Sequence, residues 1–369
     1  MHALFPVLIQ AASAVALPPY PEQAGAIVRF NAEPAVCDGE EQRATVSEEP
    51  FPLGFLQHRS APRRAPMAIT LRFRIDSSGR PLGIAISGGP AAHYDLRDLP
   101  AALAAWRFAP GAERRDCRIR FIAETEAVDT ARPDTLYRFL ALNPLSGQAR
   151  LDQVARPALQ RARPATSTCE PPMPSPRQLA FPPFERIPQP PGTLSYSWVG
   201  FDIAADGRIR AARLLSGSGN HLLDRESLSA ISRSRYQPGV RTGCIYHFFR
   251  RGSGPMLPPP PPEDDSLRPE SATCPNDEPE WAAMPPLQFP LAFNRRGIEG
   301  WAILAYDLAP WGEPGNVRVL AAEPAAAFGD QAAMIVRSAR AAAGPGYVGC
   351  TVRVVFRLPD GTPTAAADD

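Results

Sequence analysis

Cysteine is the residue whose number and spacing point most clearly to chemistry in this chain. Six cysteines occur, and two of them fall at matching places in each of three successive stretches. An even count in a repeated register favours disulfides, which persist in oxidising compartments. We therefore predict three bonds, which join Cys37 to Cys117, Cys169 to Cys244 and Cys274 to Cys350. The alternative is a set of six buried thiols in a cytosolic protein.

Other reactive side chains lack the spacing of a catalytic or metal site. The sequence has no C-x-x-C and no G-x-S-x-G motif, so it indicates neither a zinc site nor a serine nucleophile. The histidines have no partners at the sequence level. Among them, His247 alternates with Tyr246 and Phe248, and we expect it to face water on an edge strand. The sequence predicts no enzymatic activity, cofactor or metal, and an enzyme with a site between units is kept as an alternative.

The cysteines flank a repeated pattern of elements. In each stretch a Phe-Pro pair follows the first cysteine, and two runs of alternating apolar residues then surround a glycine turn. Alternation with a period of two on both sides of a turn predicts a β-hairpin. The interval from strand aromatic to turn glycine is the same in all three stretches: Phe73 to Gly79, Phe201 to Gly207, and Tyr306 to Gly312.

A helix is predicted after each hairpin, because apolar residues recur there at helical spacing. In the second stretch Leu228 and Ile231 face inward, and we expect Asp224 to be the N-cap. A Pro-Gly stop follows, and a short strand begins at the second cysteine. Trp106 and Tyr236 end two of these helical stripes, and we expect them to pack in the core rather than to bind a ligand.

The segment "FDIAADGRIRAARLLSGSGNHLLDRESLSAISRSRYQPG", residues 201–239, resembles the C-terminal domain of TonB, the periplasmic energy-transducing protein. The matching features are an aromatic-x-aliphatic strand, a D-G turn, a helix start and a helix exit: Phe201-Asp202-Ile203, Asp206-Gly207, Ser218-Gly219 with Leu223-Asp224, and Arg235-Tyr236-Gln237-Pro238. The first stretch keeps Trp106-Arg107-Phe108 with Pro110. The resemblance covers residues near 51–122, 180–250 and 287–358.

This resemblance implies an α+β fold of three tandem small TonB C-terminal-like units, each an antiparallel sheet of about three strands with a packed helix. It also implies a partner, because an exposed edge strand in this family can pair with an extended peptide from an outer-membrane receptor. Main-chain hydrogen bonds give such strand addition its affinity. We expect the edge to be the last strand of each unit, at Arg118, Arg120, Ile245, His247, Thr351 and Arg353.

The patterns divide the chain into an N-terminal segment, three units, two linkers and a tail. We expect a signal peptide at residues 1–16, where a short apolar run ends in Ala14-Val15-Ala16; a membrane anchor or a misplaced start codon is the alternative. The rest divides into unit 1 at 17–127, a segment at 128–168, unit 2 at 169–252, a Pro-rich linker at 253–272, unit 3 at 273–359, and a disordered tail at 360–369. The segment at 128–168 is a linker or an added helical cover, and we expect Pro157 to interrupt its helix-like part.

Charge and composition narrow the classes of function. The net charge of +1 gives no indication of nucleic-acid binding, and 44% hydrophobic residues suffice for packed cores. The leading hypothesis is a periplasmic protein that binds extended peptides or partner proteins at its sheet edges. The alternative is a membrane-anchored TonB transducer that couples to outer-membrane transporters, with membrane contact only if the N-terminal segment is retained. Ordinary family members have one such domain and a long spacer, so the transducing role does not transfer automatically.

Overall fold

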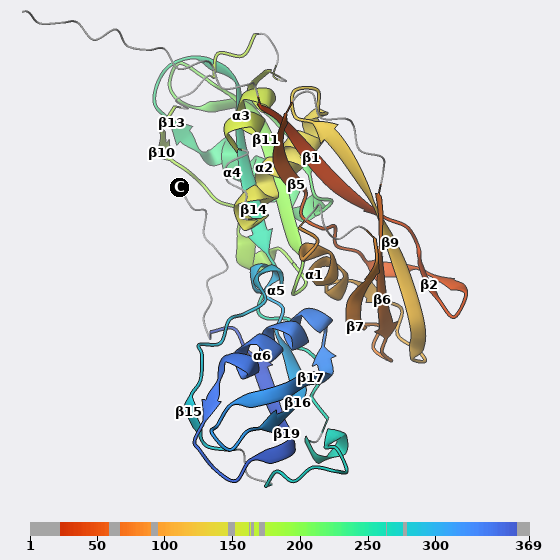
Figure 1. Cartoon of the computed structure of the whole chain (residues 1–369). Coiled ribbons are helices and arrows are strands. Elements are labelled where there is room, and N and C mark those ends of the chain that lie inside the picture. Colours follow the sequence, from red (N-terminus) through yellow and green to blue (C-terminus); the bar gives the residue numbers. More distant parts are fainter. Residues whose placement is uncertain are drawn as a thin grey trace, which may run out of the picture.

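A computed structural model describes residues 23–58, 67–89, 95–146, 152–161, 163, 166–169, 174–262, 264–275 and 279–359. Within them the chain is α+β, with small antiparallel sheets and helices packed on them (Figure 1). The expected signal peptide at 1–16 and the expected tail at 360–369 lie outside the described residues.

The second unit is built on a three-stranded antiparallel sheet. Its strands follow the order β12-β11-β14, and their bounds are Ile209–Gly217, Leu194–Ile203 and Arg241–Arg251. Helix α4 (His221–Arg233) packs on this sheet. Two short strands form a separate pair, β10 (Pro176–Gln178) with β13 (Arg235–Tyr236), and a short 3₁₀ helix lies at Phe184–Arg186.

The third unit repeats this order of elements. Its sheet has the order β17-β16-β19, with bounds Pro314–Glu323, Gly300–Leu308 and Tyr347–Phe356. Helix α6 (Ala326–Ser338) covers one face, and β15 (Trp281–Ala283) pairs with β18 (Arg340–Ala341). A short helix, α5 (Leu291–Arg296), precedes the sheet, and a 3₁₀ turn at Asp264–Leu267 contacts β19.

The first unit has the same elements in the same order and adds strands to them. The repeated part comprises β6 (Met67–Ile75), β7 (Pro81–Gly88), α1 (Asp98–Ala104), β9 (Arg114–Ala127) and the pair β4 (Ala44–Val46) with β8 (Arg107–Phe108). Four further strands enlarge the sheet to seven strands: β1 (Gln23–Ala32), β2 (Ala35–Cys37), β3 (Glu40–Gln42) and β5 (Leu53–His58).

Three disulfides tie an early part of each unit, which is strand β2 in the first unit and the segment before the sheet in the other two, to the last strand of that unit's sheet. They join Cys37 to Cys117, Cys169 to Cys244 and Cys274 to Cys350, which are the pairs predicted from the repeat register. The half-cystines are buried, and no cysteine is free. Each bond closes a loop of 75 to 80 residues, so each unit is held together at the start and end of its own sequence.

The turn glycines have a packing reason to recur. Gly79, Gly207 and Gly312 have φ of +84°, +81° and +87°, a region that L side chains rarely adopt. A Cβ on any of them would lie within about 2.2 Å of a carbonyl oxygen in the short strand that follows the helix. The carbonyl of each glycine also accepts a backbone hydrogen bond from that strand. Only glycine therefore fits where the hairpin turn meets the helix exit.

Helix α4 of the second unit begins at a different residue from the one expected from the sequence. Asn220, not Asp224, is the N-cap of α4, and its side chain accepts the Leu223 N–H at 3.0 Å. Asp224 lies one turn into the helix and is buried against Gly217, and burial raises the pKa of its carboxyl group. The helix therefore begins four residues earlier than an Asp224 cap would allow.

The segment between the first two units forms a helical cover. Helices α2 (Pro133–Ser146) and α3 (Asp152–Arg161) pack on each other, and α3 continues through Pro157, where the sequence predicted an interruption. Phe139 and Leu140 of α2 share a buried cluster with Trp198 of β11 and with Ile27 of β1. These helices therefore cover a face of the second sheet and join it to the first unit, as Figure 1 shows.

The Pro-rich segment before the third unit is also packed. Met256 forms an isolated parallel β-bridge with Ile298: its N–H donates to the Gly297 carbonyl, and its carbonyl accepts the Glu299 N–H. The Trp301 indole N–H donates to the Pro259 carbonyl at 2.7 Å. Residues 256–259, expected to be part of a linker, therefore lie against the third unit.

Candidate edge strands

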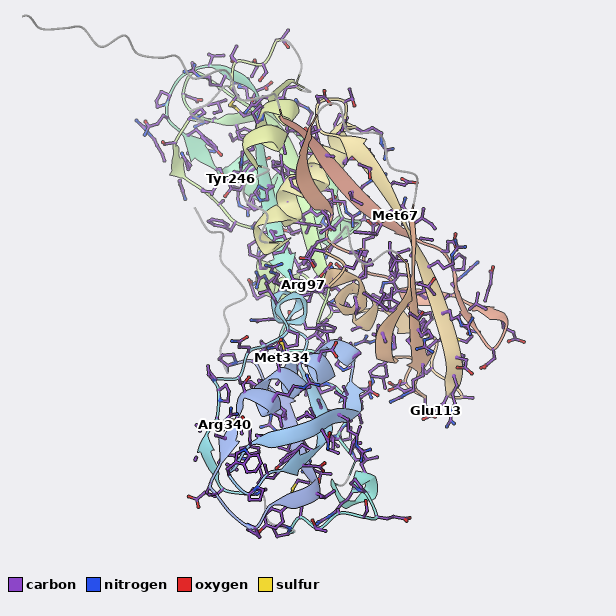
Figure 2. The ribbon with its side chains drawn as sticks, in the orientation of Figure 1. Met67, Arg97, Glu113, Tyr246, Met334 and Arg340 are labelled. Atoms are coloured by element: carbon purple, nitrogen blue, oxygen red, sulfur yellow. A yellow bond between two sulfur atoms is a disulfide. The ribbon has the colours of Figure 1, made fainter. Side chains whose placement is uncertain are left out.

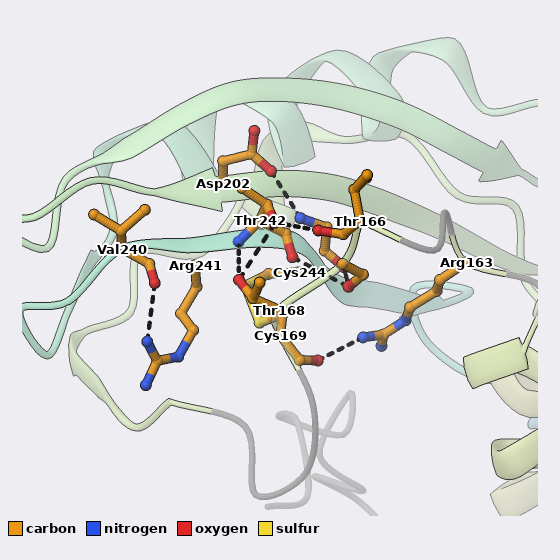
Figure 3. Close-up of a disulfide and its surroundings, with 11 residues drawn as sticks. Arg163, Thr166, Thr168, Cys169, Asp202, Val240, Arg241, Thr242 and Cys244 are labelled. Atoms are coloured by element: carbon orange, nitrogen blue, oxygen red, sulfur yellow. Dashed lines mark hydrogen bonds between the residues drawn. A yellow bond between two sulfur atoms is a disulfide. The ribbon is translucent and has the colours of Figure 1, made fainter.

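Strand β14 ends the second sheet and has one strand neighbour among the described residues, β11. A short segment covers only its beginning. The Thr168 and Cys169 N–H groups donate to the Thr242 carbonyl, and the Thr242 N–H donates to the Thr168 hydroxyl at 2.9 Å (Figure 3). From Ile245 onward no described strand pairs with its outer side.

Strand β19 occupies the same place in the third unit. Its described strand neighbour is β16, and the Thr273 N–H donates to the Val348 carbonyl near its start. Thr351 is half-buried, and Arg353 is exposed on the face away from α6. Val355, next on that face, is 38% exposed. This strand leaves more of its length accessible than β14 does.

Strand β9 of the first unit is not an edge, and the expectation for Arg118 and Arg120 is wrong on this point. β9 pairs with β6 on one side and with β1 and β2 on the other. Arg118 lies opposite both Arg72 and Val36, and the Arg120 carbonyl accepts the Glu33 N–H at 2.8 Å. The N-terminal strands of the chain therefore occupy the edge that we expected to be open.

His247 lies in β14 but does not face water. Its ring stacks on Trp198 with centroids 4.5 Å apart, on the face that α2 and α3 cover. Burial, and secondarily the nearby Arg156 charge, lower the pKa of His247 to about 4. The expectation of a water-facing histidine fails because this sheet is covered on both faces. Every residue of β11 except the half-buried Asp202 is buried. Ile245 packs at the margin of the same cluster.

Two aromatic residues singled out in the sequence have the expected packing roles. Trp106 is buried in the first unit, and its indole N–H donates to the Glu48 carbonyl at 2.8 Å. Tyr236 is buried beside Phe201, with ring centroids 5.4 Å apart, and burial raises its pKa to about 12. Neither side chain is available as a ligand platform.

The sequence reasoning missed a buried charge cluster where the first and third units meet. The Arg296 side chain is fully buried and pairs with Asp98 at 2.7 Å and with Glu48 at 3.2 Å. Its guanidinium also lies 4.3 Å from the centre of the Phe51 ring. Burial raises the pKa of Glu48 to about 7 despite the attraction of Arg296. No sequence spacing relates these residues, because about 200 positions separate Asp98 from Arg296.

A second contact joins the same two units through strand residues. Arg74 of β6 donates to Glu323 of β17 at 2.5 Å, and the other carboxylate oxygen accepts the Gly83 N–H at 2.7 Å. Ile84 and Ala325 form a parallel bridge beside them. The three units therefore form one packed body.

Comparison with known families identifies two of the units. Residues 195–248 and 285–358 match the model of the Gram-negative bacterial TonB protein C-terminal domain. Over these two segments the chain is similar to that family. The matches coincide with the sheets and helices of the second and third units and confirm the resemblance for them. No curated protein matches the chain.

The family and the disulfides together indicate a compartment. TonB C-terminal domains are found in the Gram-negative envelope, and three disulfides are consistent with an oxidising environment. No helix among the described residues is long and apolar enough to cross a membrane.

Proposed function

We propose that this chain is a TonB-like protein-binding protein of the cell envelope whose second and third units bind extended peptides by strand addition. One observation carries the proposal. β14 and β19 have a strand partner on one side among the described strands, whereas the equivalent β9 has partners on both sides. The first unit thus shows, within the chain, the kind of pairing that we propose for a partner at the other two units.

The backbone direction supports the same residues. In the first unit the Arg120 carbonyl accepts a hydrogen bond from the Glu33 N–H, so this carbonyl points away from β6. Backbone groups alternate in direction along a strand, and the strands can be aligned at Cys117, Cys244 and Cys350. By this alignment Ile245 and His247 direct their N–H and C=O groups outward in β14, as do Thr351 and Arg353 in β19.

We also propose that the first unit is a divergent third copy. The family match does not cover it, but its element order, disulfide and turn glycine repeat those of the other two units. In this proposal its edge is permanently filled, so it serves as a scaffold rather than as a binding unit. We assign the chain no catalytic role.

Packing of the Pro-rich segment favours a binding protein over an energy transducer. A transducer needs a spacer that reaches across the envelope, but residues 256–259 are held by Ile298 and Trp301. Export through residues 1–16 and a soluble periplasmic location are part of the proposal.

The proposal predicts that proline in an outward-facing position abolishes peptide binding. We would measure binding of short synthetic peptides from the periplasm-facing segments of outer-membrane receptors to the full chain. Ile245→Pro and Arg353→Pro remove one outward N–H each and should together lose binding, because main-chain bonds supply the affinity.

Ile245→Ala and Arg353→Ala are the matched controls. They keep the N–H groups and should retain most of the affinity. Binding by a folded double-proline variant, or equal loss in the alanine variants, would exclude strand addition at these edges. Unchanged far-ultraviolet circular dichroism would establish that the proline variants are folded.

A further inference from the structure

The three sheets differ in what covers the face opposite their helix. In the second unit Trp198 is 5% exposed beneath α2 and α3. In the third unit the equivalent Ile303 is 1% exposed, and Trp301 in the same strand contacts Pro259 of the packed Pro-rich segment. The equivalent residue of the first unit is Thr70, which is half-buried. Its neighbours on that face, Arg72 and Arg118, are exposed. The first unit therefore leaves open a sheet face that the other two cover with their own chain.

The open face holds two arginines in an unfavourable arrangement. Arg72 of β6 and Arg118 of β9 lie directly opposite each other in the ladder. Like charges in that position repel and destabilise a sheet. Within the described part of the chain neither forms an ion pair, whereas Arg120 pairs with Glu33 at 3.1 Å and Arg74 with Glu323. Two cations thus remain uncompensated on one face.

A hollow lies beside Arg72, one of these two arginines. It has a volume of about 600 Å³ and is open to solvent, and its floor includes Phe73, Gly83 and Ala85. Arg72 and Arg74 line it from β6, and Arg115, Glu113 and Asp116 line it from the start of β9. Glu113, which is labelled in Figure 2, lies at the lower end of the first unit in that view. The small residues leave room above the strands for a ligand that reaches Arg72, and Arg118 lies opposite Arg72 in the ladder.

We propose that this face binds an acidic polypeptide segment through Arg72 and Arg118. Guanidinium groups bind carboxylates with paired, charge-assisted hydrogen bonds, and all 39 basic residues of the chain are arginine. Carboxylates at alternate positions of an extended segment lie on one side of it, about 7 Å apart, which suits cations on a sheet face. An anionic membrane is a poorer match, because attraction to an extended anionic surface needs an excess of positive charge and the net charge of the chain is only +1.

This site is separate from the edges of β14 and β19, because it uses side chains of the first unit rather than open backbone groups. The test therefore uses the full chain with a fluorescein-labelled peptide of alternating glutamate and serine, and it measures fluorescence anisotropy at low and physiological salt. Arg72→Gln/Arg118→Gln should weaken binding about tenfold at low salt, as expected for the loss of two exposed charge pairs.

Arg210→Gln/Arg241→Gln is the matched control, since it removes two exposed arginines from strands of the second unit and changes the net charge equally. It should bind like the unaltered chain. The Arg72→Gln/Arg118→Gln variant should also melt at the same or a higher temperature, because a repulsive pair is lost. Equal weakening in both variants, or no binding by the unaltered chain, would overturn the proposal. Sedimentation with phosphatidylglycerol vesicles that depends on Arg72 and Arg118, without peptide binding, would instead assign the face to a membrane.

Discussion

His247 shows how one half-buried side chain links the stability of this protein to pH. Its ring lies on Trp198 under the helical cover, and its pKa is lowered to about 4, mainly by burial. The unfolded chain therefore binds more protons than the folded chain between about pH 4 and the ordinary histidine pKa of about 6.5. The stabilisation is complete above that range and is lost as the pH falls through it.

We predict that in the His247→Phe variant the free energy of unfolding depends less on pH between about pH 4 and 6.5. In the unaltered chain His247 should contribute up to about 3 kcal/mol more stability at pH 7 than at pH 4. Urea unfolding at a series of pH values, compared between the two proteins, measures this contribution as a difference. If the unfolding free energies of the two proteins differ by the same amount at every pH, His247 titrates normally and is accessible to water.

At the scale of the element, the disulfides of the second and third units fix the chain segment that precedes a sheet against the last strand of that sheet. In the second unit Cys169–Cys244 holds Thr168 at the start of β14, where Thr168 exchanges hydrogen bonds with Thr242 (Figure 3). The bond closes a loop of 75 residues, so in the chain-entropy model it stabilises the folded state by about 4 kcal/mol.

Cys169→Ser/Cys244→Ser should therefore lower the melting temperature of the second unit and expose the start of β14. Differential scanning calorimetry without reductant, followed by hydrogen exchange at Thr242, would measure both effects. The unaltered chain with reductant should show the same loss in all three units. A melting temperature that neither treatment lowers would mean that the bonds do not constrain the unfolded chain.

The elements that the sequence predicted are those whose signals are local. Hairpins follow from apolar alternation around Gly79, Gly207 and Gly312, and the helices follow from their apolar stripes. The added strands β1 and β5 were not predicted as parts of the sheet, because their partners are distant in sequence. The helical cover was predicted only as the alternative to a linker, because its partners are also distant. A signal was present: Trp198 stands on the outer face where the first unit has Thr70. A large aromatic residue there indicates that something must cover that face.

At the scale of the whole molecule, the third unit is attached to the first by a buried ion cluster. Arg296 of α5 supplies the cation, and Asp98 and Glu48 of the first unit supply the carboxylates. Removing one member of a buried pair costs about 3–5 kcal/mol, because the remaining charges stay buried without compensation. The interface therefore depends on this one arginine more than on the contact of Arg74 with Glu323, where the arginine is 42% exposed.

We predict that Arg296→Met loosens the third unit and that the effect depends on pH. Without the arginine the carboxyl of Glu48 favours its protonated form more strongly, so the loss should be large at pH 8 and smaller at pH 5. Even with Arg296 in place, the pKa of Glu48 is raised to about 7, so in the unaltered chain, too, the contribution of Glu48 to stability falls as the pH rises. Limited proteolysis near residues 256–259 and the radius of gyration from solution scattering would report the release.

Arg337→Met is the control, because Arg337 is exposed in the last turn of α6 and lies outside the cluster. It should leave both readouts unchanged at either pH. If Arg296→Met resists protease as the control does, the first and third units are held by apolar contacts instead. If its susceptibility is the same at pH 5 and pH 8, the protonation of Glu48 does not affect the interface, and the arginine acts only through its packing on Phe51.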